Sequence, residues 1–554
     1  MVDQLAYGGE GRGWLPSAPA RPRRLPSVGT VVGVLSLVIT ILLVVGVLSA
    51  VRLAAGTQPE SVLPAASFAV AKVDLDPPLG QKLKVRDLAR HFPDAPAKDF
   101  AGLLDELGRE AAEDADLDYA RDVKPWLGKR IAIVGFRGAG GHPRSVAAIQ
   151  HVDAGKARAA LGKVRDAAFE IRGDYVVVAP DQESLAEART LTNQQSLAQR
   201  GAYHDDVATL SGDQIAQAWV DNRALVDAML SESGDDGRNP FSDALRDGSV
   251  GRTVLGLHAG DGYGELEAIT LGGPAAPSAR DAATLGRLPA AVLAAVHLDN
   301  PAAVAEGDLA SIGLPASVLG SGFPLFLFGF VAGSGSVAFS DSAESVESCI
   351  RVSSDGTRQP CPSEITPPPV GRAISAILRQ PVPDRSLDAL GEALAPAFDP
   401  DRSGALLADL TGPTTFALGA IPKDEADGTA LHVGLVSRGH HADARSHAEA
   451  AAARVRAAGF VAGAVESDGA LYAAVGAGWL EQLRSGGHLN ETPAFRRAMG
   501  DLTGEVTVAV YVDLDGLQRA IEEFPEELAP LRAIGMSVQR AGDRSTFRLR
   551  VTVD

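Results

Sequence analysis

An internal repeat is the feature that most restricts how this chain can fold. An apolar run opens with Leu-Pro-Ala-Ala at residue 63 and ends at Asp74, and a second run opens with the same four residues at 288 and ends at Asp299. Near the far ends, residues 254–271 resemble residues 536–553, and each pattern predicts two alternating strands around an Ala-Gly-Asp turn. The predicted strands and helices between these ends also follow the same order in both copies.

The spacing between the copies locates an insertion. Asp74 and Asp299 lie 225 residues apart, whereas Asp261 and Asp543 of the two Ala-Gly-Asp turns lie 282 residues apart. The second copy is therefore longer by 57 residues (282 − 225). We expect the additional segment within about 302–370.

The turns between the predicted strands decide the fold class. Short turns such as Arg172-Gly173-Asp174 imply antiparallel neighbours. Amphipathic helical stretches follow at 154–167 and 442–458. We therefore predict an α+β protein with two related repeats, residues 61–273 and 286–554, each a largely antiparallel sheet covered by helices. The repeats should superpose once the insertion is removed.

A long uncharged run precedes the first copy. Residues 28–51 read VGTVVGVLSLVITILLVVGVLSAV, and a helix of this length would span about 36 Å, enough to cross a hydrocarbon core of about 30 Å. A cleaved signal peptide is the alternative, although its apolar region is usually about 7–15 residues long. Four arginines precede the run and only Arg52 follows it closely, so we expect the N-terminus on the cytoplasmic side.

These features predict the topology and the partners. Residues 1–27 are expected to form a disordered cytoplasmic tail, residues 28–51 a transmembrane helix in the lipid bilayer, and residues 52–62 a linker. The protein would then be a single-pass cell-membrane protein with an extracytoplasmic C-terminal part. The whole chain carries a net charge of −19 and residues 1–52 carry +3, which leaves −22 for the remainder. Such an acidic surface repels phosphate backbones and argues against nucleic-acid binding.

The two cysteines, Cys349 and Cys361, would lie on the extracytoplasmic side in this topology. Disulfides persist there, and the turn signal at residues 354–356 brings the ends of the segment together. We therefore predict a disulfide, with free thiols as the alternative, and closing so short a loop contributes about 3 kcal/mol in the chain-entropy model.

Two segments resemble a known family. LPAASFAVAKVDLDP at 63–77 and DVKPWLGKRIAIV at 122–134, placed after an N-terminal anchor helix, resemble an uncharacterised family of actinobacterial proteins, domain of unknown function 3352. The resemblance covers roughly residue 60 to the C-terminus. It implies an anchored, exported protein, and it implies no catalytic residues because the family has no assigned activity.

The best metal-site candidates lie in Val-Asp-Leu-Asp, which occurs at 73–76 and at 512–515. Residues two apart on a strand face the same way, so Asp74 with Asp76, or Asp513 with Asp515, would jointly present oxygens to a hard cation. The simpler interpretation is that an aspartate at a strand end caps the following helix. Among the histidines, His447 stands four residues after Asp443, which suits an ordinary surface pair.

An apolar tract lies inside the insertion. Residues 312–340 carry no charge and include the four phenylalanines Phe323, Phe326, Phe328 and Phe330. One interpretation buries the tract between the two repeats. The other leaves an exposed patch that contacts the membrane, an apolar ligand or a partner protein.

Catalytic motifs are missing from the sequence, since it contains no GxSxG, HExxH or phosphate-binding loop. No cofactor is expected. We predict a non-enzymatic binding or scaffold module of the cell envelope, with an envelope protein or an apolar ligand as its partner. A carrier or sensor for a lipid-like ligand, and a hydrolase whose residues meet only in the fold, are the alternatives.

Overall fold

Sixteen strands of the described residues join in a single sheet, although a long insertion interrupts the second half between residues 298 and 414. The computed structural model describes residues 58–76, 79–92, 117–164, 167–232, 251–273, 283–305, 350–352, 358–360, 406–419, 432–500, 505–520 and 528–553, with a few single residues between them.

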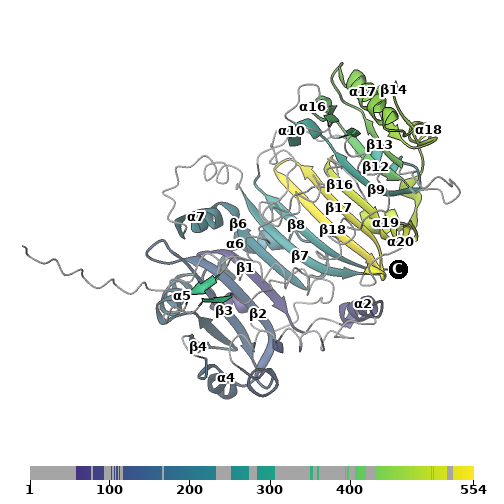
Figure 1. Cartoon of the computed structure of the whole chain (residues 1–554). Coiled ribbons are helices and arrows are strands. Elements are labelled where there is room, and N and C mark those ends of the chain that lie inside the picture. Colours follow the sequence, from purple (N-terminus) through teal and green to yellow (C-terminus); the bar gives the residue numbers. More distant parts are fainter. Residues whose placement is uncertain are drawn as a thin grey trace, which may run out of the picture.

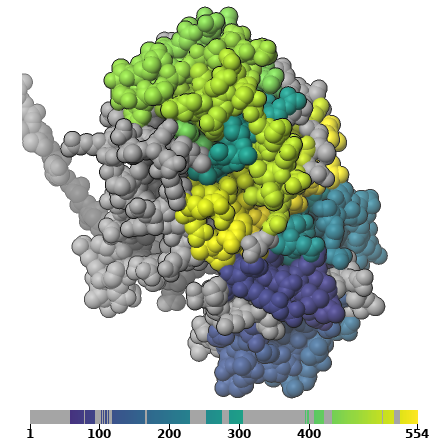
Figure 2. Space-filling model, turned by 90° about the vertical axis from the view of Figure 1, so that its right-hand side faces the viewer, coloured from purple at the N-terminus to yellow at the C-terminus, as the bar shows by residue number. Residues whose placement is uncertain are grey.

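One antiparallel sheet of 16 strands runs through the whole molecule (Figure 1). Its order is β14-β15-β13-β12-β9-β16-β17-β18-β8-β7-β6-β1-β2-β3-β5-β4. The prediction of two α+β repeats with separate sheets behind a transmembrane helix is therefore wrong. The physical reason lies at β8 and β18, because each would be an unpaired edge in a separate sheet, and the two edges pair with each other instead. Figure 2 shows the two halves in succession along one elongated molecule.

Each half contributes eight strands, and their order along the sheet is the same. The first half contains β1 (Ser67–Asp74), β2 (Leu127–Arg137), β3 (Pro143–His151), β4 (Ala168–Arg172), β5 (Tyr175–Ala179), β6 (Ala216–Asp221), β7 (Arg252–Gly260) and β8 (Tyr263–Leu271). The second contains β9 (Val292–Leu298), β12 (Thr414–Gly419), β13 (His432–Ser437), β14 (Ala462–Ser467), β15 (Ala470–Val475), β16 (Glu505–Asp513), β17 (Leu531–Ala541) and β18 (Arg544–Val553). Superposition of the two halves stays a prediction.

The strand registers define which residues are equivalent. Val73 pairs with Ala216 between β1 and β6, and Leu298 pairs with Val508 between β9 and β16. Equivalent residues therefore differ by 225 in the first strand of each half (298 − 73) and by 292 in the sixth (508 − 216). These offsets also relate two backbone hydrogen bonds, Leu197 N to Leu63 O at 2.8 Å and Leu489 N to Leu288 O at 3.0 Å.

Helices cover both faces of the sheet. Face A, which carries Val70 and Trp219 in the first half, packs against η1 (Pro59–Val62), α5 (Gln182–Gln194), η3 (Leu197–Gln199) and α6 (Gly201–Val207). Its continuation in the second half packs against α9 (Ala283–Gly286), α18 (Trp479–Ser485), η5 (Leu489–Glu491) and α19 (Pro493–Met499). The opposite face carries α2 (Leu79–Ala89), α4 (Ala154–Leu161), α7 (Asn222–Glu232), α10 (Pro301–Ala305), α16 (Leu406–Asp409), α17 (Ala444–Ala457) and α20 (Leu514–Ala520).

The two end hairpins correct the sequence match by one residue. The first turn, Asp261-Gly262, lies between the paired residues Gly260 and Tyr263, and the second, Gly542-Asp543, lies between Ala541 and Arg544. Structurally equivalent residues here differ by 281 in number (541 − 260), whereas matching the Ala-Gly-Asp turns in the sequence gives 282. The glycine takes a positive φ in both turns, 77° at Gly262 and 64° at Gly542, so it occupies the second turn position in one hairpin and the first in the other.

The predicted single-pass membrane location is wrong for the described part of the chain. No helix in this part is both long enough and apolar enough to cross a membrane, and residues 28–51 lie outside it.

The predicted disulfide is not found in the described part either, since Cys349 and Cys361 also lie outside the described residues. Between the cysteines, β10 (Ile350–Val352) pairs with β11 (Arg358–Pro360). Residues 312–340, with Phe323, Phe326, Phe328 and Phe330, are likewise outside.

Candidate functional site

An open cleft lies on face A of the first half, between α6 and the sheet. Its volume is about 400 Å³. The lining combines short aliphatic side chains with polar ones from the end of β1, from α6 and from the start of β6. The polar members are Lys72, Asp74, His204, Asp213, Gln214 and Gln217.

A buried aspartate holds α6 above the cleft. Asp206 accepts hydrogen bonds from Trp219 Nε1 at 2.8 Å and from Arg252 Nε at 2.5 Å. The guanidinium of Arg200, at the start of α6, lies 4.4 Å from the centroid of the Trp219 ring and donates to the carbonyl of Ser67 at 2.6 Å. These contacts join α6 to β6, β7 and the start of β1, so they fix the roof of the cleft.

Lys72 in the lining of the cleft belongs to a buried ion pair. Lys72 Nζ lies 2.7 Å from Glu60 Oε1, and both side chains are almost completely shielded from solvent. The hydroxyl of Tyr203 donates to the same carboxylate oxygen at 3.2 Å. Burial, followed by the negative charge of Glu60, raises the pKa of Tyr203 far above its ordinary value, so this phenol stays protonated and acts as a donor.

The four aspartates proposed as metal ligands contact groups of the chain itself. Asp74 Oδ1 accepts a hydrogen bond from the Asp76 amide at 3.0 Å, and burial raises the pKa of Asp74. Asp76 contacts the amino groups of Lys129 and Lys82, whose hydrogen bonds lower its pKa. In the second copy, Asp513 accepts from Gly516 N at 2.9 Å and Asp515 lies 3.2 Å from Arg519.

These four carboxylates are thus engaged in helix starts and ion pairs. In the part of the chain that the structure describes, no group of three or more His, Cys, Asp or Glu side chains is placed to hold a metal ion. The structure brings the members of each pair together, and it surrounds Asp76 and Asp515 with lysines or arginines.

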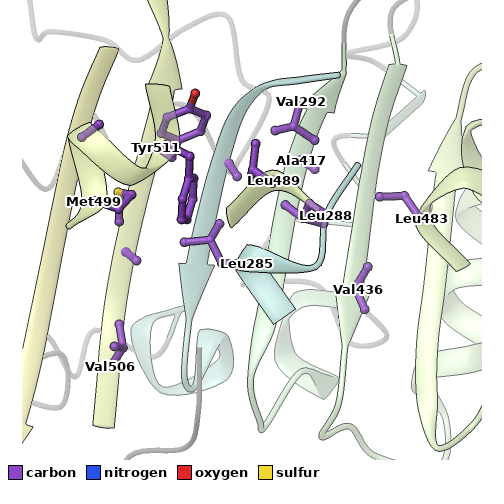
Figure 3. Packing of buried hydrophobic residues seen from close by; sticks show 14 of the residues in the cluster. Leu285, Leu288, Val292, Ala417, Val436, Leu483, Leu489, Met499, Val506 and Tyr511 are labelled. Atoms are coloured by element: carbon purple, nitrogen blue, oxygen red, sulfur yellow. The ribbon is translucent and has the colours of Figure 1, made fainter. Parts of the chain in front are cut away.

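Several positions of the equivalent region in the second half carry apolar side chains (Figure 3). Residues Glu60, Val207, Gln214 and Trp219 of the first half correspond to Leu285, Met499, Val506 and Tyr511, all buried in one apolar cluster. Gln217 corresponds to Ala509, which is also buried there. The two halves share their backbone plan, but Gln214 and Gln217 line a cleft in the first half whereas their equivalents belong to an apolar core in the second. The positions of Lys72 and Asp74 remain polar in the second half, as His297 and Asp299.

Sequence reasoning missed Lys72, Glu60 and Tyr203, because nothing in a single strand pattern marks a lysine as buried. A signal was nevertheless present within the repeat. Lys72 aligns with His297 and Glu60 with Leu285 at the common offset of 225, so a charged pair stands where the other copy has none. Sequence reasoning also missed the partner of the His447 ring, whose Nδ1 lies 2.5 Å from Asp409 Oδ2 on α16.

A half-buried histidine on face A predicts a pH-dependent stability. His258 Nε2 lies 3.5 Å from Glu265 Oε1, and its ring packs edge-on against Tyr263. Burial lowers the pKa of His258 below its ordinary 6.5, against the opposing effect of Glu265 and Glu267 and together with Arg550 and Lys84. The unfolded chain therefore binds this proton first as the pH falls, and the folded state loses stability from about pH 6.5 down to the lowered pKa.

His258→Gln isolates this effect, because the equivalent residue of the second half is Gln539. We expect the free energy of unfolding to fall less steeply between pH 6.5 and 5 in the variant than in the wild type, as measured by urea unfolding at several pH values. Parallel pH profiles would contradict the assignment to His258.

No family model, no curated protein and no solved structure matches this chain. The resemblance to domain of unknown function 3352 therefore stays a prediction.

Proposed function

We propose that the chain is a non-enzymatic binding module and that the cleft of the first half holds its ligand. A volume of about 400 Å³ lies within the range of about 300–1,000 Å³ that small-molecule sites occupy. Among the ionisable groups that line the cleft, the two on β1, Lys72 and Asp74, already have partners in the fold. They are therefore better suited to shaping a site than to acting as nucleophile or base.

The difference between the two halves is the observation that carries this proposal. A buried ion pair can usually be replaced by well-packed apolar residues with no loss of stability, and often with a gain. The second half has apolar residues at the positions of Glu60, Gln214 and Gln217, so this fold does not require a polar cleft there. Retention of Lys72, Glu60 and an open volume in the first half is consistent with binding.

The lining favours a small polar ligand over the lipid-like ligand of the alternative hypothesis. The Gln217 side chain makes no hydrogen bond to any residue that the structure describes, and within the same residues the buried Oε1 atom of Gln214 has no partner. Val207, Leu210 and Ile215 add short aliphatic surface. A molecule with amide, hydroxyl or amine groups on a short carbon skeleton matches this combination.

Transfer of the second-half residues into the cleft tests the proposal. The triple variant V207M/Q214V/Q217A introduces the residues found at 499, 506 and 509, and we expect it to remove both glutamine amides from the lining of the cleft. The full-length protein is screened by ligand-observed NMR against a panel of small amides, amines, polyols and carboxylic acids. The wild type should bind at least one class, and the variant should bind it at least about tenfold more weakly, equivalent to about 1.4 kcal/mol.

D205N is the matched control, because Asp205 lies on the same helix but is exposed and does not line the cleft. It should bind like the wild type. Unchanged binding by the triple variant, or no binding of any panel member by the wild type, would remove the support for a site in this cleft.

A further inference from the structure

The contact between the two halves is nearly symmetric. β8 and β18 pair antiparallel through eight residue pairs, from Tyr263 with Thr552 to Thr270 with Ser545. Each strand is the second arm of an end hairpin, and equivalent residues of the hairpins differ by 281. The residue equivalent to Glu267 is therefore Arg548 (267 + 281), which is also the residue that Glu267 faces across the seam. A residue pair that faces its own equivalent marks the local twofold axis of the contact.

The charges on this axis are opposite, and the acidic one is buried. Arg548 Nη2 lies 3.0 Å from Glu267 Oε1, and the Glu267 side chain is only 1% exposed. The other oxygen of Glu267 accepts hydrogen bonds from the amide and the hydroxyl of Ser211. One step along the same face, Arg550 Nε lies 2.7 Å from Glu265 Oε2, and the Arg550 guanidinium covers the Tyr263 ring at 4.1 Å.

The same register applied to two identical halves would bring like charges together. If β8 paired with β8 of a second molecule about this axis, Glu267 would face Glu267, and Glu265 would face Ile269. If β18 paired with another β18, Arg548 would face Arg548. A buried charge without its partner is strongly destabilising, and like charges directly opposite on antiparallel strands repel.

We propose that Glu267–Arg548 and Glu265–Arg550 make the edge of β8 select the edge of β18 and reject a second copy of itself. Pairing of β8 with β8 of a second molecule is a real alternative for this fold. The backbone groups of an edge strand can hydrogen-bond to any suitable strand, whatever its sequence. Two halves with the same strand order offer nearly the same edge. The two ion pairs therefore provide the specificity that backbone hydrogen bonds lack, and the strand that fits the β8 edge is β18.

A reassembly experiment on the whole chain tests this selection. A protease site inserted after Gly273 allows the folded protein to be cut between its halves. Cut wild type, labelled with ¹⁵N, and the cut charge-exchanged variant E267R/R548E, unlabelled, are unfolded together in urea, refolded together and examined by native mass spectrometry. We expect matched pairs of halves to exceed mismatched pairs by at least about tenfold, with no pairs of identical halves.

Statistical mixing of the labelled and unlabelled halves, or pairs of two first halves, would overturn the proposal. A second measurement does not depend on reassembly. In the uncut chain, E267R and R548E should each lower the urea midpoint, and the double variant should lie closer to the wild type than either single variant. The proposal would also be overturned if the urea midpoint of the double variant fell by the sum of the decreases in the two single variants. Full recovery is not expected, because E267R removes the acceptor of the Ser211 hydrogen bonds.

Discussion

Lys72→Met should lower the free energy of unfolding by about 3–5 kcal/mol. The substitution removes the cation that lies 2.7 Å from Glu60 Oε1 and leaves a carboxylate whose residue is only 4% exposed. The Glu60 Oε2 atom has no hydrogen-bond partner among the described residues, so the buried charge would depend on Tyr203 alone. Urea unfolding of the full-length protein, followed by circular dichroism at pH 7, measures the loss.

The residues of the second half provide the matched control. In the triple variant K72M/E60L/Y203F the charged and hydroxyl groups are removed together, and two of the new residues are those at the equivalent positions Leu285 and Phe495. Complete replacement of a buried ion pair by apolar residues is often neutral or stabilising. The triple variant should therefore recover most of the stability that K72M loses. A triple variant as unstable as K72M would show that the loss does not come from the unpaired Glu60.

Trp219→Ala should cost about 3–5 kcal/mol, the usual range for removing a large aromatic side chain from a core. Trp219 is completely buried and packs edge-on against Tyr203, with ring centroids 6.0 Å apart. The substitution also removes the donor to Asp206 and the ring beneath Arg200. Since both contacts hold α6, the variant should also lose protection from hydrogen exchange in residues 201–207 before it loses protection in the sheet.

Trp219→Tyr is the control, because Tyr511 occupies the equivalent position and packs against Phe495 with ring centroids 5.0 Å apart. An aromatic ring is retained, so its loss of stability should be clearly smaller than that of W219A. Equal losses for the two variants would mean that the hydrogen bond to Asp206, and not the ring, carries the contribution of Trp219.

Local patterns along the chain determined much of the fold. Turns such as Arg172-Gly173-Asp174 specify hairpins because a short turn leaves only an antiparallel neighbour within reach. Matching end motifs identified the two hairpins β7–β8 and β17–β18, although the position of the glycine shifted the structural match by one residue. Asp153, Asp181 and Asp513 accept amide hydrogen bonds at helix starts, as aspartates at the ends of strands are expected to do.

Only the tertiary structure decided how the halves meet and where the site lies. Pairing of β8 with β18 joins residues about 280 positions apart, and sheet edges carry no local signal for their partner. The cleft depends on how α6 rests on β6, and the burial of Lys72 depends on Glu60 from another segment. The repeat in the sequence determined which positions are equivalent to within one residue. Whether such a position becomes an apolar core or a polar cleft depends on side chains that meet across the fold, since burial energies arise from contacts and not from sequence neighbours.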